Sequence, residues 1–374
     1  MPVRYIRVNP LVDLFAPAVR AFGNIAIVGK ITTPTPNPPA DLLAVNIPVA
    51  FSDPAEARRR APGDLGEAIA LAFAQTPGPT LVYGVAVDAT APNWQAGLDA
   101  VTALNVQIVT LANVPMTATT TAGTGPIGLL STHVTSVSNT GGDGMERIGV
   151  AMLTKDSSNP ADVNGLTNER MVYIAHKSTQ DAAAAVAGTI AGYPPHVSLL
   201  LKPVAISSGS FTPTEINALN GDETFDSGPA GHGVNWLTTP SLIPGGGVFM
   251  GEGYTGNPSG KKFIDIVREV DDLSFRLKAQ LIKTIGNVRI SRSGLRALIA
   301  QMEAVLGPLV DTDVIEGFEL VVPLLTLLDK DPATLTAAEA AQINLAHANR
   351  LIQVLAAVEY GGAIHRISIT LKCE

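Results

Sequence analysis

Short apolar runs alternate with helix-like or polar stretches from residue 24 to about residue 205. Runs that are apolar throughout are typical of parallel strands covered by helices on both faces of a sheet. The predicted strands are, in chain order, 25–30, 80–87, 106–114, 147–153, 171–176 and 197–205. The helices predicted between them are 66–75, 94–104 and 179–192. This order of elements predicts an α/β sheet.

A different pattern begins at residue 206. Glycine, proline, serine, threonine and asparagine dominate 206–260, which indicates a loop-rich boundary. Apolar residues then recur every three to four positions over 261–285, the spacing of a long helix with one buried face. A second helix is predicted at about 293–306.

The last 40 residues contain a helix signal followed by two strand signals. Thr336 and Glu339 have the spacing of a capping box, which predicts a helix from there to about Arg350. Apolar residues then alternate over 352–358, and Gly361-Gly362 fits a tight hairpin turn before a return strand at 363–372. A terminal strand of this kind recruits another strand unless something covers its edge.

Length, charge and composition argue against several classes of function. The 374 residues are enough for two or three domains, and only 16% are charged, so part of the surface is expected to be buried against other chains. The net charge of −8 argues against direct nucleic-acid binding. Neither a signal peptide nor an apolar run of membrane-spanning length is found, so we expect a mature, soluble protein of cytosolic origin without membrane insertion. The single cysteine, Cys373, excludes an intrachain disulfide.

Candidate chemistry is sparse. GEGYTG (251–256) matches the spacing of a dinucleotide-binding motif, but Asn257-Pro258-Ser259-Gly260 separate it from the predicted helix. The six histidines are not paired at metal-ligand spacing, and neither a P-loop nor a GxSxG motif is present. We therefore predict no catalytic residue, no metal site and no cofactor, and that the protein is not an enzyme.

The order of segments along the chain is similar to that of a known protein family. The α/β region, SGSFTPTEINALN (208–220), GVNWLTTP (233–240), GEGYTGNP and the helix at 263–285 together resemble the tail sheath proteins of contractile bacteriophages and related injection machines. EYGGAIHRISITLK (359–372) is similar to the terminal strands of that family. The likeness is strongest from about residue 206 to residue 374.

The resemblance implies an α/β domain with a subtilisin-like, non-catalytic parallel sheet, followed by an α+β C-terminal sheath domain and flanked by extended terminal strand arms. The implied divisions are an N-terminal arm and first strand (1–22), packing with the C-terminal domain or a neighbour, an outer domain (23–247), an inner, tube-facing domain (248–362) and a C-terminal arm (363–374).

In such a family the subunit polymerises as stacked rings in a helical sheath around a tail tube, and contraction drives the tube through the host envelope to deliver a genome. The implied partners are further copies of the chain, the tail tube protein, and the baseplate and tail terminator proteins. The implied location is the virion, after assembly in the host cytoplasm. A flexible arm that adds a strand to a neighbour stays paired while rigid bodies slide.

Particular residues follow from the resemblance. The arms that exchange strands between subunits correspond to Val3, Arg4, Tyr5, Ile6, Arg7 and Val8, and to Ile364, Arg366, Ile367, Ser368, Ile369, Thr370 and Leu371, in the stretch that ends at Lys372. Candidate tube contacts are Lys261, Lys262, Arg268, Arg276 and Lys278.

Four alternatives remain open at this point. The terminal strands can pair within one subunit, and the basic residues of the helix can simply be solvated. The particle can be a phage-derived injection or secretion apparatus instead of a virus. In a different class, the chain can be a cytosolic α/β enzyme that binds a dinucleotide at 251–256, which predicts a small closed oligomer and thermal stabilisation by the ligand.

Overall fold

The structure is a computed structural model that describes residues 22–365, except 35, 141–143, 160–162, 164–165 and 221–232. The described chain divides into two compact units. Residues 22–272 with 363–365 form the first, here called the sheet unit, and residues 273–362 form the second, here called the helical unit. The predicted arm residues Val3–Val8 and Arg366–Leu371 lie outside the described residues.

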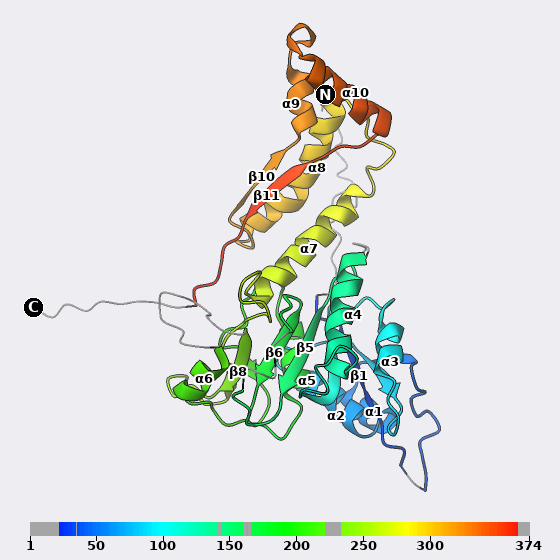
Figure 1. Cartoon of the computed structure of the whole chain (residues 1–374), viewed down its shortest axis with the longest axis vertical. Coiled ribbons are helices and arrows are strands. Elements are labelled where there is room, and N and C mark those ends of the chain that lie inside the picture. The colour runs from blue at the N-terminus through cyan, green and yellow to red at the C-terminus, as the bar shows by residue number, and fades with distance from the viewer. Residues whose placement is uncertain are drawn as a thin grey trace, which may run out of the picture. The chain divides into compact units, whose positions relative to one another are not determined.

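A nine-stranded sheet forms the centre of the sheet unit, in the order β2-β3-β1-β4-β5-β6-β8-β9-β7 (Figure 1). Its six middle strands run parallel, with Ile25 of β1 opposite Val82 of β3 and Ile108 of β4. The remaining pairs, β2 with β3, β8 with β9 and β9 with β7, are antiparallel. The strands are β1 (Ile25–Lys30), β2 (Pro48–Phe51), β3 (Val82–Val87), β4 (Ile108–Met116), β5 (Ile148–Leu153), β6 (Met171–Ala175), β7 (Pro203–Val204), β8 (Val234–Thr238) and β9 (Val248–Met250).

Helices cover both faces of this sheet, as uniformly apolar strands require. Ile25 and Ile27 face a core shared with α1, α2 and α5, whereas Ala26 and Val28 face a core shared with α3 and α4. The helices are α1 (Pro54–Arg60), α2 (Asp64–Phe73), α3 (Trp94–Val101), α4 (Pro126–Thr140), α5 (Ala182–Gly192) and α6 (Pro213–Asn220). The prediction of a parallel α/β sheet is therefore confirmed.

One predicted strand is wrong. Within 197–205 only Pro203–Val204 forms a strand, which pairs with β9, and only residues 200 and 201 form a turn. Leu199 and Val204 are buried, whereas Leu201 is 45% exposed, because a short apolar run can bury single side chains without forming a strand along its whole length. In the sheet unit the sequence pattern also missed the strands β2, β8 and β9 and the helices α1, α4 and α6.

The helical unit begins within α7 (Ile264–Leu281), the predicted long helix. It continues with α8 (Arg292–Asp311), β10 (Gly317–Val321), α9 (Pro323–Asp329), the short 3-10 helix η3 (Pro332–Thr334), α10 (Ala337–Asn349) and β11 (Leu355–Glu359). The capping box at the start of α10 is present as predicted, with Thr336 and Glu339 reciprocally bonded. Leu306, Leu309 and Ile315 form one apolar cluster of this unit with Leu273 of α7.

The boundary between the units differs from the predicted change at 247/248. It lies between Asp272 and Leu273, because β9 at 248–250 pairs with β7 and β8 and so belongs to the sheet. Most of the return strand predicted at 363–372 lies outside the described residues, so the hairpin at Gly361-Gly362 stays a prediction. The described partner of β11 is β10, in an antiparallel ladder that sets Phe318 opposite Val358, and residues 363–365 form no strand.

Candidate assembly surfaces

The C-terminal segment is fixed to the sheet unit at His365. The Nε2 of His365 lies 2.9 Å from Ser198 Oγ, and its Nδ1 lies 2.9 Å from Glu252 Oε2. The imidazole also meets the ring of Phe263 edge-on, with the ring centroids 4.8 Å apart. When Nδ1–H donates to the carboxylate, the neutral ring accepts the Ser198 hydroxyl at Nε2. Both ring nitrogens are then satisfied, so His365 anchors the chain where the C-terminal arm begins.

This arrangement has the connectivity of a Ser–His–acid triad. The Leu200 backbone N–H donates a hydrogen bond to Ser198 Oγ at 3.3 Å. This bond lowers the electron density on Oγ, which makes the hydroxyl a weaker nucleophile. A cavity of about 320 Å³ lies beside it, lined by His196, Val197, Ser198, Leu200, Lys202, Ala363 and Ile364. Sequence reasoning missed this site because 167 residues separate Ser198 from His365.

Strands β10 and β11 form a two-stranded sheet in the helical unit, to which no third described strand is paired. One face, with Phe318, Leu320 and Val358, packs on the cluster around Leu306. The opposite face leaves Val321 38% and Leu355 54% exposed. An isolated two-stranded ribbon is marginal, and its unpaired edge is a template for a further strand.

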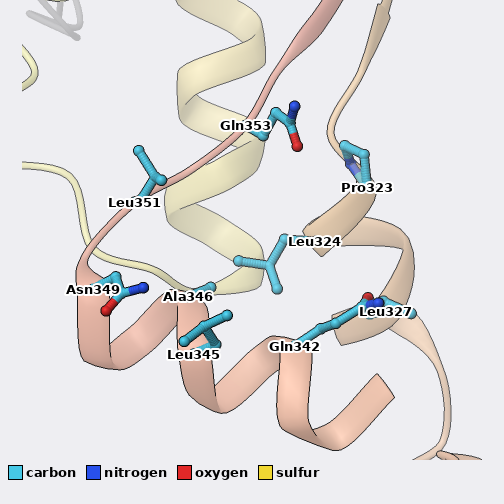
Figure 2. Close-up of a pocket in the computed structure, with 9 residues that line it drawn as sticks. All are labelled: Pro323, Leu324, Leu327, Gln342, Leu345, Ala346, Asn349, Leu351 and Gln353. Atoms are coloured by element: carbon cyan, nitrogen blue, oxygen red, sulfur yellow. The ribbon is translucent and has the colours of Figure 1, made fainter. Parts of the chain in front are cut away.

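An apolar groove lies between α9 and α10, here called the α9–α10 groove. Figure 2 shows Leu324 between the two helices, with Leu345 and Ala346 on the side of α10 that faces it. The groove has a volume of about 240 Å³, and no charged side chain lines it. Its full lining is Pro323, Leu324, Leu327, Gln342, Leu345, Ala346, Asn349, Leu351 and Gln353. Leu345 is 60% and Leu351 69% exposed, so the groove presents apolar side chains to solvent.

The predicted tube contacts lie in different environments. Lys261 Nζ lies 3.6 Å from Glu169 Oε1 and is partly exposed, and Lys262 is also partly exposed. Arg276 is half-buried and Lys278 is exposed, both on α7. Arg268, on the same helix, is only 6% exposed.

The structure revises the prediction for Arg268. Its guanidinium donates to the backbone carbonyls of Tyr193 at 2.9 Å, Phe22 at 3.3 Å and Pro194 at 3.4 Å. Burial lowers its pKa to about 10, but the group stays charged at neutral pH. These contacts occupy Arg268 in joining α7 to the sheet unit, and no surface is left for a partner.

A buried ion pair reinforces that joint. Arg170 donates from both terminal nitrogens to Asp271, at 2.8 and 2.9 Å. Glu269, two positions before Asp271 on α7, is 3% exposed, and neither of its carboxylate oxygens has a hydrogen-bond partner among the described residues. Burial raises the pKa of Glu269 to about 7, and the carboxylates of Asp265 and Asp272 add to the rise.

The GEGYTG segment packs closely against other residues of the sheet unit. The backbone N–H groups of Gly251, Tyr254, Thr255 and Gly256 all donate to oxygen atoms of the chain, so they are not available to a phosphate. A Cβ on Gly251 would lie 2.2 Å from the Trp236 ring, and a Cβ on Gly256 would lie 2.4 Å from the Tyr173 ring. Since α7 starts only at Ile264, the segment does not open a helix either.

Other chemistry is equally limited in the described part of the chain. It holds no group of three or more histidine, cysteine, aspartate or glutamate side chains able to bind a metal ion. None of its helices is long and apolar enough to cross a membrane.

Comparison with solved structures identifies the architecture. A chain of the contracted PVC sheath complex, an extracellular contractile injection system, is similar at a TM-score of 0.68 and 11% identity, with 100% of this chain and 98% of that chain covered. The chain has the fold of a contractile sheath protein. The helical sheath of the anti-feeding prophage in its contracted state is similar at a TM-score of 0.66 and 12% identity, over 100% and 99% of the two chains.

This chain is also similar in structure to a tail protein. A sheath tail protein from Desulfitobacterium hafniense is similar at a TM-score of 0.58 and 10% identity, over 86% of this chain and 93% of that chain. No protein-family model and no curated protein matches the sequence. The likeness is therefore one of structure, and it confirms the resemblance to tail sheath proteins inferred from the order of segments.

Proposed function

We propose that this protein is the sheath subunit of a contractile tail or injection apparatus. The observation that carries the proposal is the match of the whole chain, end to end, to chains of assembled contracted sheaths. The sparsely charged composition supports it, since a subunit in a lattice buries much of its surface against copies of itself. The subunit polymerises helically around a tail tube and occupies the tail of a virion or of a phage-derived particle.

In this proposal the terminal arms link neighbouring subunits. Residues Val3–Val8 and Ile364–Lys372 add strands to a sheet of another copy, and the edges of β10 and β11 to which no further described strand is paired supply the acceptor. Ile364, at the root of the C-terminal arm, is 78% exposed, as a residue leaving its own subunit would be. Paired arms keep the subunits connected while their rigid units rotate.

Contraction then needs no enzymatic step and no cofactor. The driving free energy is the difference in interface burial between an extended, tube-bound lattice and a compact one. Lys261, Lys262, Arg276 and Lys278 are the proposed contacts with the tube, and the baseplate and terminator proteins cap the two ends. Contraction drives the tube through a target envelope and delivers a genome from a phage, or another cargo from an injection particle.

The dinucleotide-binding alternative loses its support, because the N–H groups of residues 251, 254, 255 and 256 are already bonded within the chain.

Negative-stain electron microscopy of the purified full-length protein, expressed without a tube, tests the proposal. We expect hollow, ridged cylinders, and we expect deletion of residues 1–8 to abolish them. Small closed particles whose melting temperature rises with NAD would contradict the sheath function and support the enzyme.

A further inference from the structure

We propose that the α9–α10 groove binds residues Leu11–Phe15 of a second copy of this chain. The inference rests on the proposed function, because arm exchange brings the N-terminal arm of one subunit to the helical unit of another. It adds a side-chain docking site to the main-chain pairing of the arm.

The groove needs a covering partner. Helix α10 has no buried residue, although it carries Ile343, Leu345 and six alanines within Ala337–Asn349. Leu345 and Leu351 expose most of their side chains into or beside the groove. Burying two such leucines against a partner removes apolar surface from water and so stabilises the contact. An apolar groove with an uncharged lining selects an apolar occupant.

The segment Leu11–Phe15 has the matching chemistry. Its sequence is LVDLF, four apolar residues around the single charge of Asp13, and Pro10 and Pro17 bound it. Prolines on both sides limit regular structure to a short stretch, as a groove of this size requires. At the rim, the amides of Gln342, Asn349 and Gln353 each offer a donor and an acceptor to the backbone of a bound segment.

The groove lies next to the start of β11, which favours the segment Leu11–Phe15 as its occupant. Residues 351–354 precede β11 directly, so an arm that runs antiparallel along Leu355–Glu359 leaves that strand towards the groove. Leu351 lies four positions before Leu355, about 13 Å in an extended chain. Residues 11–15 follow Val8 by three to seven positions, about 10–23 Å, which spans that distance.

Disulfide trapping between two differently tagged chains tests the contact. Both chains carry C373S, one carries L14C and the other L351C, and they are co-expressed at full length and oxidised with a mild oxidant. A disulfide needs Cα atoms within about 7 Å, so a product bearing both tags reports docking between copies. We expect that product in assembled cylinders. A chain carrying T90C in place of L351C, exposed in the sheet unit, is the matched control and should give none.

The outcomes separate the two proposals. Cylinders without the L14C–L351C product overturn the docking site and leave the sheath function standing. Failure to form cylinders in the parent C373S protein contradicts both. A disulfide that forms only within one doubly substituted chain, in unassembled protein, assigns the groove to the chain's own N-terminal segment and overturns docking between copies.

A single substitution gives an independent readout. L351N alters an exposed side chain, so the subunit should fold normally, and we expect the concentration needed for assembly to rise about tenfold. L242N, at a leucine that is 93% exposed in the sheet unit, is the control and should assemble like the parent. Equal assembly of both variants would contradict the role of the groove.

Discussion

His365 Nδ1 lies 2.9 Å from Glu252 Oε2, although 113 residues separate the two. The contact holds His365, near the start of the proposed C-terminal arm, in the sheet unit. We expect H365A to raise the concentration needed for assembly about tenfold, equivalent to about 1.4 kcal/mol, because the root of the arm is then no longer held. Sedimentation of particles over a range of protein concentrations measures it. S198A, which keeps the carboxylate contact, should have a smaller effect, and unchanged assembly of H365A would refute the anchor.

The Arg170–Asp271 pair should contribute strongly to stability. Their side chains are 13% and 10% exposed, so removal of one partner leaves a buried, unpaired charge. We expect R170A to lower the free energy of unfolding by about 3 kcal/mol in urea. The matched control is R58A, because Arg58 pairs with Glu67 at the surface, where about 0–1 kcal/mol is expected. Similar losses of unfolding free energy for both variants would show that burial does not determine how much each ion pair contributes to stability.

Glu269 should make stability depend on pH. Its pKa is raised to about 7 in the folded chain from an ordinary 4.5, so the folded state binds a proton that the unfolded state releases between those values. The free energy of unfolding should therefore fall as pH rises from 5 to 8. E269Q removes this dependence and should be more stable than the parent by about 2 kcal/mol at pH 8, with little difference at pH 5.

Urea unfolding at the two pH values measures the effect. E303Q, at an exposed glutamate of α8, is the control and should leave the pH dependence of the parent unchanged. Parallel pH curves for E269Q and the parent would argue against a raised pKa at Glu269.

The glycines of GEGYTG should be needed for folding and not for ligand binding. In G251A the new Cβ would meet the Trp236 ring at 2.2 Å, so we expect a loss of 1–3 kcal/mol, as in other overpacked cores, measured by thermal or urea unfolding. NAD at millimolar concentration should leave the melting temperature of the parent unchanged. G245A is not a suitable control because Gly245 has a φ of 92°, whereas G307A on α8 has open space for its Cβ and should be tolerated.

Charge reversal tests the proposed contact with the tube. K261E/K262E should reduce co-assembly with the cognate tube protein and leave cylinder formation without the tube unchanged, because in the proposed sheath the lysines contact the tube and the arms contact other subunits. K283E, at an exposed lysine just after α7, is the control for the loss of positive charge. Normal co-assembly of K261E/K262E would remove both lysines from the interface.

Local signals in the sequence were sufficient for many elements. The run Ile25–Lys30 is a strand with the predicted bounds, and the capping box at Thr336 starts a helix at the next residue. Both depend on interactions within a few residues, namely backbone pairing propensity and side-chain bonds to nearby N–H groups. The long helix and the parallel α/β sheet followed from periodicity in the same way.

By itself, then, the sequence determined the helices α2, α3, α5, α7, α8 and α10, the strands β1, β3, β4, β5 and β6 of the large sheet, and the likeness to sheath proteins. Only the tertiary structure decided that β11 pairs with β10, that Arg268 is buried among carbonyls, and that His365 meets Ser198 and Glu252. These contacts join residues far apart in the chain, and the free energy of such a contact depends on which elements become neighbours. Apolar periodicity specifies that a face is buried, whereas the packing of the whole chain selects the partner that buries it.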